Sequence, residues 1–148
     1  MSDAIELKVR LDDGALAPDR AYPTDAGADL FAPHDVHVPA RGSALVDTGV
    51  HVELPEGTCG LLVSKSGLNV RENVLSTGLI DAGYTGSIAV KLYNHGEKPV
   101  TLGKGSKISQ LVVLPVLLPR IVPVDEISGG PRGENGFGST ETAPRVAE

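Results

Sequence analysis

Residues 78–92 read Gly-Leu-Ile-Asp-Ala-Gly-Tyr-Thr-Gly-Ser-Ile-Ala-Val-Lys-Leu, and this stretch decides the fold class. Its second half alternates apolar side chains with Ala89 and Lys91, which is the period-two pattern of a half-buried β-strand. Its first half begins with the apolar Leu79 and Ile80 and continues with Asp81 and Tyr84, which lie among glycines. This pattern predicts a turn between two strands.

The same alternation recurs over Ile5–Leu11 and Val50–Leu54. Leu111–Leu114 and Ile121–Val124 are continuously apolar, which predicts more fully buried strands. Only Gly67–Asn73 has the features of a short helix. Many short strands joined by turns predict an all-β domain, either a sandwich, a jelly roll or a barrel.

The composition changes near Ser128, so residues 1–128 are expected to form the β-rich core. Residues 129–148 are glycine-rich and bury too little apolar surface to offset the entropy of ordering them. A cation, Arg132, and an aromatic ring, Phe137, stand among these glycines. This combination fits either a disordered tail or a flexible arm that closes over a ligand.

The overall composition excludes several classes of protein. The chain has 148 residues, of which 41% are hydrophobic, and this suits one domain with a core. Its net charge of −6 argues against nucleic-acid binding, which needs a basic face. An acidic chain can hold a polyphosphate only with a few placed cations, backbone N–H groups and a metal ion.

The expected location is cytoplasmic. The one cysteine, Cys59, cannot form an internal disulfide, which fits a reducing compartment, and its strand-like context predicts a buried thiol rather than a nucleophile. Residues 1–6 carry acidic groups and no apolar run, so no signal peptide is expected. The apolar stretch 108–124 is interrupted by three prolines and an arginine, so no membrane contact is expected.

Three short segments carry candidate chemistry, and each also has a plain structural explanation. Asp81 and Tyr84 form either an ordinary hairpin turn or a carboxylate base beside a ring that packs on a sugar or base. Asp25 and Asp29 fit either an acidic surface loop or a magnesium site, because Mg²⁺ usually takes one or two carboxylates plus substrate phosphates. Ser64–Gly67 fits a turn or a phosphate-binding segment.

Other chemistries lack their patterns. Gly105–Leu111 does not match the GxxxxGK[ST] spacing of a P-loop, so an ATPase is not expected. The four histidines are scattered and the cysteine has no partner at ligand spacing, which argues against zinc. No GxSxG elbow is present, although the composition alone does not exclude a Ser-His-Asp triad.

Five segments, in chain order, resemble the five motifs of the trimeric dUTPase family. They are Asp25–Ala32, Ser64–Leu68, Gly78–Gly86, Gly105–Leu111 and Arg132–Thr140. The third and fifth are specific, and together the five extend over nearly the whole chain. The resemblance implies a jelly-roll-like distorted barrel, a homotrimer with shared active sites, and a C-terminal arm that closes over each site.

The resemblance also implies Mg²⁺-dependent hydrolysis of dUTP to dUMP and pyrophosphate by water attack at the α-phosphorus. That reaction keeps uracil out of DNA and supplies dUMP for thymidylate synthesis. Asp81 would deprotonate the water, Tyr84 would exclude a ribose 2′-hydroxyl, and Asp29 would hold Mg²⁺ through its waters.

The other implied contacts are with the substrate. The residues expected near the phosphates are Lys65, Ser66, Gly67 and Gln110. The backbone of Gly78 and Ile80 in the hairpin would bind the uracil edge. In the arm, Arg132 would clamp the γ-phosphate and Phe137 would stack on uracil, with further contacts from Gly138, Ser139 and Thr140.

The sequence departs from the family pattern at three positions, one of which is Glu141, which follows Thr140 where Gly is usual. Lys65 stands where most members have Arg, and it offers a point charge instead of a planar fork. Leu75 stands where many bacterial members have Asn, in a stretch that is shorter than usual. Three alternatives stay open: a dCTP deaminase of the same fold, a sensor that binds dUTP without turnover, and a structural β-sandwich.

Overall fold

The structure is a computed structural model that describes residues 4–140. The chain divides into two units, of which the first ends at Leu118 and the second begins at Pro119. Residues 141–148 of the expected arm lie outside the described residues.

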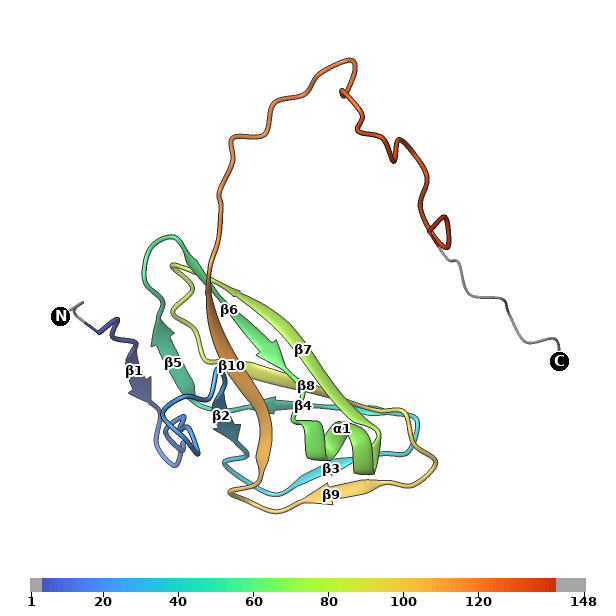
Figure 1. Cartoon of the computed structure of the whole chain (residues 1–148). Coiled ribbons are helices and arrows are strands. Elements are labelled where there is room, and N and C mark those ends of the chain that lie inside the picture. Colours follow the sequence, from blue (N-terminus) through green and yellow to red (C-terminus); the bar gives the residue numbers. More distant parts are fainter. Residues whose placement is uncertain (1–3, 141–148) are drawn as a thin grey trace, which may run out of the picture. The chain divides into compact units, whose positions relative to one another are not determined.

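The first unit consists of strands with one short helix among its described residues (Figure 1). The helix, α1, follows β6 and precedes β7. The elements in chain order are β1 (Lys8–Leu11), β2 (Ala28–Phe31), β3 (Val36–Val38), β4 (Ser43–Asp47), β5 (Val50–Glu53), β6 (Thr58–Val63), α1 (Ser66–Glu72), β7 (Val74–Asp81), β8 (Ala89–Asn94), β9 (Val100–Leu102) and β10 (Lys107–Pro115).

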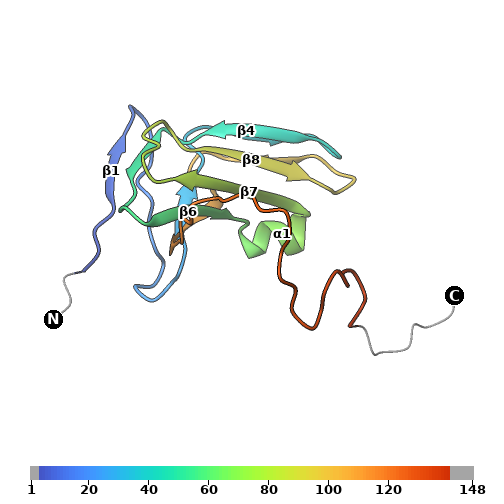
Figure 2. The same ribbon diagram turned by 90° about the horizontal axis from the view of Figure 1, so that it is seen from above.

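Six strands form one antiparallel sheet in the order β2-β10-β6-β7-β8-β4, while β1 pairs with β5 and β3 pairs with β9. Figure 2 shows β4, β8, β7 and β6 in this order. The large sheet curls into a half-barrel, which confirms the all-β, jelly-roll-like fold that the sequence predicts. Among residues 4–140, no helix is long and apolar enough to cross a membrane.

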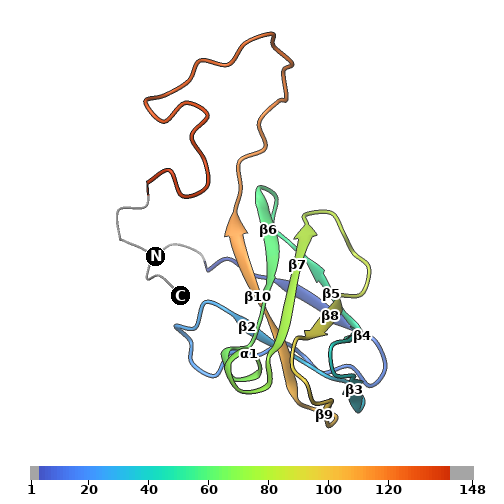
Figure 3. The ribbon, with the colours of Figure 1, turned by 90° about the vertical axis from the view of Figure 1, so that its right-hand side faces the viewer.

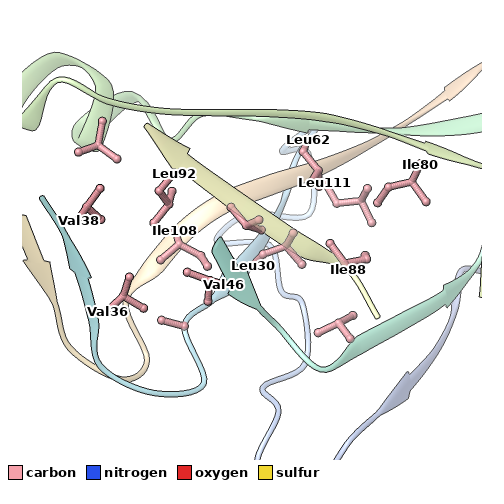
Figure 4. Packing of buried hydrophobic residues seen from close by; sticks show 14 of the residues in the cluster. Leu30, Val36, Val38, Val46, Leu62, Ile80, Ile88, Leu92, Ile108 and Leu111 are labelled. Atoms are coloured by element: carbon pink, nitrogen blue, oxygen red, sulfur yellow. The ribbon is translucent and has the colours of Figure 1, made fainter. Parts of the chain in front are cut away.

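The core comes from alternating positions of these strands. Val50 and Val52 of β5 are buried, as are Val90 and Leu92 of β8, so the predicted alternation is confirmed. Figure 4 shows how the buried aliphatic side chains of several strands point toward one another. Fully burying each such side chain stabilises the fold by about 1.5–3 kcal/mol, which lets a chain without Trp build its core.

Three of the strand predictions are wrong in whole or in part. Leu111–Leu114 lies in β10 as predicted, but its Leu114 is 39% exposed instead of buried. Ile121–Val124 forms no strand, and Ile121 is 90% exposed. The prolines that flank this segment have no N–H to donate, and no strand of the described chain pairs with it. β1 begins at Lys8 instead of Ile5, and its Val9 remains 40% exposed. The predicted short helix is confirmed as α1, and Cys59 is buried as expected.

Candidate active site

A pocket opens where β7 and β8 diverge. The ladder between these strands runs from Val74↔Asn94 to Ser76↔Leu92 and ends there. Beyond it, β7 stays paired with β6 as far as Asp81, while the chain returns through a loop to Ala89. The divergence leaves a pocket of about 260 Å³. The four predicted hairpin residues Gly78, Ile80, Asp81 and Tyr84 all line it.

The divergence also exposes backbone groups. Residues 77–81 pair with β6 on one side, and the described β8 ladder does not reach them on the other. Backbone N–H and C=O groups that lack a strand partner need another hydrogen-bonding partner. The pocket-facing edge of β7 can therefore bind the polar edge of a planar ligand. Leu75, one of the departures from the family pattern, lies in the paired part of β7 opposite Tyr93 and does not line the pocket.

Local contacts hold Tyr84 at the pocket. Its N–H donates to the Asp81 carbonyl at 3.1 Å, and its hydroxyl donates to the Ser87 carbonyl at 2.9 Å. Gly83 has φ of +93°, which side chains rarely adopt. A Cβ at Gly86 would lie 2.6 Å from the phenol Cζ, so only glycine leaves room for the ring to fold back.

A cationic cluster surrounds Asp29, which is buried. The Lys65 ammonium lies 2.5 Å from Asp29 Oδ1, and the Lys107 ammonium lies 2.9 Å from Oδ2. Burial alone would raise the pKa of Asp29, but the hydrogen bonds and charges of both lysines outweigh it and lower that pKa. The carboxylate in turn raises the pKa of Lys107. Asp29 is therefore a stable counter-ion for two cations.

Gln110 lies opposite Asp29 in the β10–β2 ladder, so the predicted metal ligand lies beside the predicted phosphate-binding residues of the second and fourth motifs. Its amide donates to the Ser64 carbonyl at 3.1 Å. Gly27 leaves the space that this side chain needs, because a Cβ there would lie 2.9 Å from Gln110 Cδ. Ser66 and Gly67, the exposed first residues of α1, complete this end of the site.

Three serines connect the strands beneath this cluster. The Ser76 and Ser109 hydroxyls, both buried, are 2.8 Å apart, and the Ser109 hydroxyl donates to the Val63 carbonyl at 3.1 Å. The Ser64 hydroxyl donates to the Ser76 carbonyl at 2.9 Å and accepts from its N–H at 2.8 Å. These bonds join the end of β6 to β7 and β10, and so fix the segment that carries Lys65.

Lys107 was not among the site residues predicted from the sequence. A β-bulge between Lys107 and Ser109 changes the alternation in β10, so that Ile108 and Ser109 are both buried while Lys107 reaches Asp29. Its place in the fourth motif was the available signal, but strand periodicity alone cannot locate a bulge.

The residues fit a metal ion only in a limited way. Asp29 is the one buried carboxylate of the described chain, and both of its oxygens face ammonium groups. Among residues 4–140, no three His, Cys, Asp or Glu side chains gather closely enough to hold an ion. This donor set does not form a cage, but it suits an ion that keeps its waters and takes its other ligands from phosphates.

The pocket and the cationic cluster lie at opposite ends of the β6–β7 pair. Asp81 pairs with Cys59 near the start of β6, whereas Lys65 follows the end of β6. Cys59 and Lys65 are six positions apart along an extended chain, a distance of about 20 Å at roughly 3.3 Å per residue. Figure 3 shows α1, which begins next to Lys65, far from the arrowhead of β7.

The fifth motif belongs to the second unit. Its described residues form successive turns, in which Arg132 Nε donates to the Asn135 carbonyl at 2.8 Å. Phe137 is fully exposed, and the segment from Gly138 to Thr140 is exposed as well.

An apolar pocket with a carboxylate and a ring, together with a separate cationic cluster, characterises a protein that binds a phosphorylated nucleoside. The family model described as dUTPase matches residues 13–141. The chain belongs to the dUTPase family.

A named relative and two solved structures agree with this assignment. The deoxyuridine 5'-triphosphate nucleotidohydrolase of Clostridium acetobutylicum is 39% identical over 140 residues, which is 92% of this chain and 97% of the relative. The Staphylococcus bacteriophage 80alpha dUTPase, solved with dUPNHPP, is 32% identical with a TM-score of 0.84, covering 94% of this chain and 100% of that one. A dUTPase mutant from phage phi11 of S. aureus, solved with a structural Mg(II) ion, is 30% identical with a TM-score of 0.76, covering 82% and 98%.

Proposed function

We propose that this chain hydrolyses dUTP to dUMP and pyrophosphate with the residues described above. The observation that carries the proposal is the pocket between the diverging strands, which combines a carboxylate, an aromatic ring and an open backbone edge. The reaction would keep uracil out of DNA and supply dUMP for thymidylate synthesis. The lone, buried Cys59 supports a cytoplasmic location.

The pocket would bind the nucleoside. Uracil presents alternating acceptors and a donor along one edge, and the backbone of Gly78 and Ile80 offers complementary groups. The Tyr84 ring, fixed by its hydrogen bond to Ser87, would pack on the deoxyribose and leave no room for a 2′-hydroxyl. This arrangement would favour dUTP over UTP.

Asp81 would act as the general base. Its exposed carboxylate stands at the end of β7, where pairing with Cys59 fixes the backbone. It would accept a proton from a water molecule as the water oxygen bonds to the α-phosphorus. The bond between that phosphorus and the bridging oxygen would break, and pyrophosphate would leave. A positioned base typically contributes about 10²–10⁴-fold.

The cationic cluster would bind the phosphates. Lys65, Ser66, Gly67 and Gln110 present charge and hydrogen-bond donors at one end of the sheet. A Mg²⁺ ion held by Asp29 through water would neutralise phosphate charge. From the arm, Arg132 would pair with the γ-phosphate and Phe137 would stack on uracil, with Gly138, Ser139 and Thr140 adding contacts.

We also propose a homotrimer with shared active sites. A general base must lie within about 3 Å of the attacking water, and one triphosphate cannot span the distance from Asp81 to Lys65 on one chain. Two chains would therefore supply the two ends of each site. Exposed apolar side chains after β10 support an assembly, because Leu117 is 93% exposed and Ile127 is 90% exposed.

The proposal is tested by incubating the protein with Mg²⁺ and, separately, dUTP, dCTP, dTTP and UTP while following release of pyrophosphate and ammonia. Pyrophosphate from dUTP alone is expected, and Asp81→Asn is expected to lower kcat by at least about 100-fold while the circular dichroism spectrum stays unchanged. Binding of dUTP without turnover would indicate a sensor, and ammonia from dCTP would indicate a deaminase.

A further inference from the structure

A histidine outside the pocket contacts the loop that carries Tyr84. His51 lies on β5, and its side chain is 14% exposed. Its Nδ1 lies 2.8 Å from the Thr85 carbonyl oxygen, and its Nε2 lies 3.0 Å from Asp12 Oδ2. Thr85 follows Tyr84 directly, so this contact fixes the backbone next to the ring that lines the pocket.

The chemistry of the two contacts sets the charge of His51. A carbonyl oxygen and a carboxylate oxygen only accept hydrogen bonds, so both imidazole nitrogens must donate. Only the doubly protonated imidazolium can do so, because a neutral imidazole has one N–H. A neutral His51 therefore keeps one contact and loses the other.

A second carboxylate, Asp47, holds the same loop at Ser87. The Ser87 hydroxyl donates to Asp47, which also accepts from the Gly49 N–H at 3.0 Å. The hydroxyl of Tyr84 donates to the Ser87 carbonyl. The loop is thus fixed at Thr85 and at Ser87, and only the contact at Thr85 depends on a group that titrates near neutral pH.

We infer that protonated His51 is a positioning residue for the substrate pocket, and that loss of its proton loosens the Thr85–Tyr84 backbone and weakens dUTP binding. The inference rests on the proposed function, because it takes the pocket at Tyr84 as the nucleoside site. His51 itself does not line the pocket.

The surrounding charges favour the protonated form. The Asp12 hydrogen bond raises the pKa of His51 first, followed by the Thr85 carbonyl, while burial and Arg10 oppose them less strongly. The same pair lowers the pKa of Asp12, whose other oxygen accepts from Arg10 at 3.0 Å. Asp47 adds a further negative charge close enough to sense His51. The remaining charged groups beside His51 on the β1–β5 pair are Lys8 and Glu53, which form an ion pair with each other at 3.1 Å.

The sign of the pH effect follows from this shift. The His51 pKa is raised from its ordinary value of 6.5, so both contacts persist at and below that pH. One of the two is lost as the pH rises through the raised value, so His51 then no longer joins Asp12 to Thr85. KM for dUTP should therefore increase on the alkaline side. Because pairing with Cys59 holds Asp81 in β7, kcat should change by less than about twofold.

The test compares KM and kcat for dUTP across the neutral pH range in the wild type and three variants. The variants are needed because the substrate phosphates titrate in the same range and could themselves change KM. His51→Ala is expected to have a KM about 2- to 10-fold higher than the wild type at acidic pH, with little further rise. In Asp12→Asn, the Asn amide can donate to a neutral Nε2 while its oxygen accepts from Arg10, so KM should stay low at alkaline pH. His95→Gln, at an exposed histidine, should reproduce the wild-type profile.

An NMR titration of the His51 ring provides a readout independent of turnover, and Asp12→Asn should lower its pKa. If His51→Ala keeps the wild-type pH profile of KM in an active enzyme, this inference is wrong and the proposed function stands. If the wild type does not hydrolyse dUTP at any pH, both are wrong.

Discussion

Two inactive variants of this chain should restore activity when they assemble together. The prediction comes from the separation of about 20 Å between Asp81 and Lys65 along the β6–β7 pair. If each site takes Asp81 from one chain and Lys65 from another, an Asp81→Asn chain can still supply Lys65. A Lys65→Ala chain can still supply Asp81.

The expected recovery can be calculated. In a cyclic trimer, every mixed trimer contains one site in three with both functional residues, and random mixing at equal amounts gives about one quarter of all sites. Asp81→Asn should have at least about 100-fold lower activity than the wild type. Lys65→Ala removes a charged hydrogen bond worth about 1.5–3 kcal/mol, so its activity should be lower by about tenfold or more. Without chain exchange, the mixture would show the parental mean, which is the average activity of the two variants and roughly a twentieth of wild-type activity.

The assay is co-refolding of the two variants with different affinity tags, followed by pyrophosphate release from dUTP. A matched control mixes Asp81→Asn with Tyr84→Ala, both altered at the same end of the site. No site in that mixture combines both functional residues, so activity should stay at the parental mean. Mixed trimers of Asp81→Asn and Lys65→Ala that remain at the parental mean, although the tags copurify, would refute the shared-site reasoning.

Three further perturbations test the local architecture. Ser109→Ala should destabilise the protein by about 1–3 kcal/mol because it leaves the buried Ser76 hydroxyl without an acceptor. Ser76→Ala should lower the free energy of unfolding by less, and urea unfolding at fixed protein concentration measures both values. Gly86→Ala should displace the Tyr84 ring and lower the preference for dUTP over UTP about tenfold in kcat/KM. Lys107→Ala should raise KM for dUTP about tenfold with a smaller change in kcat, measured at saturating Mg²⁺.

The sequence was sufficient for the fold class because strand periodicity is a local property. Val50 and Val52, or Val90 and Leu92, alternate with polar neighbours, and the structure buries them as expected. The failure at Ile121–Val124 has a different origin. An apolar run indicates that a segment needs to be buried, but not whether its own chain supplies the partner.

Some of the site residues could be predicted from the sequence and others could not. Asp81, Tyr84 and Lys65 stand in short motifs, so composition and order alone made them candidates. His51 and Asp12 are 39 residues apart and in no motif, and they meet only because β1 pairs with β5. Lys107 reaches Asp29 through a bulge. Contacts of this kind depend on register, which a single sequence does not specify.

The two ends of the site should also respond differently to pH. Asp29 holds two lysines, so its cluster carries two positive charges and one negative charge within a chain of net charge −6. Because its pKa is lowered, Asp29 remains a carboxylate at neutral pH and keeps both cations ordered before the phosphates arrive. Lysine side chains lose up to about 2 kcal/mol of rotamer entropy when they are fixed, and prior ordering reduces the part of this that substrate binding must offset. The pocket end depends instead on His51, whose pKa is raised above its ordinary value of 6.5 by the Asp12 hydrogen bond and the Thr85 carbonyl. A pH dependence of nucleoside affinity that survives in His51→Ala would therefore arise from the substrate phosphates or another group, because Asp29, whose pKa is lowered, stays ionised in that range.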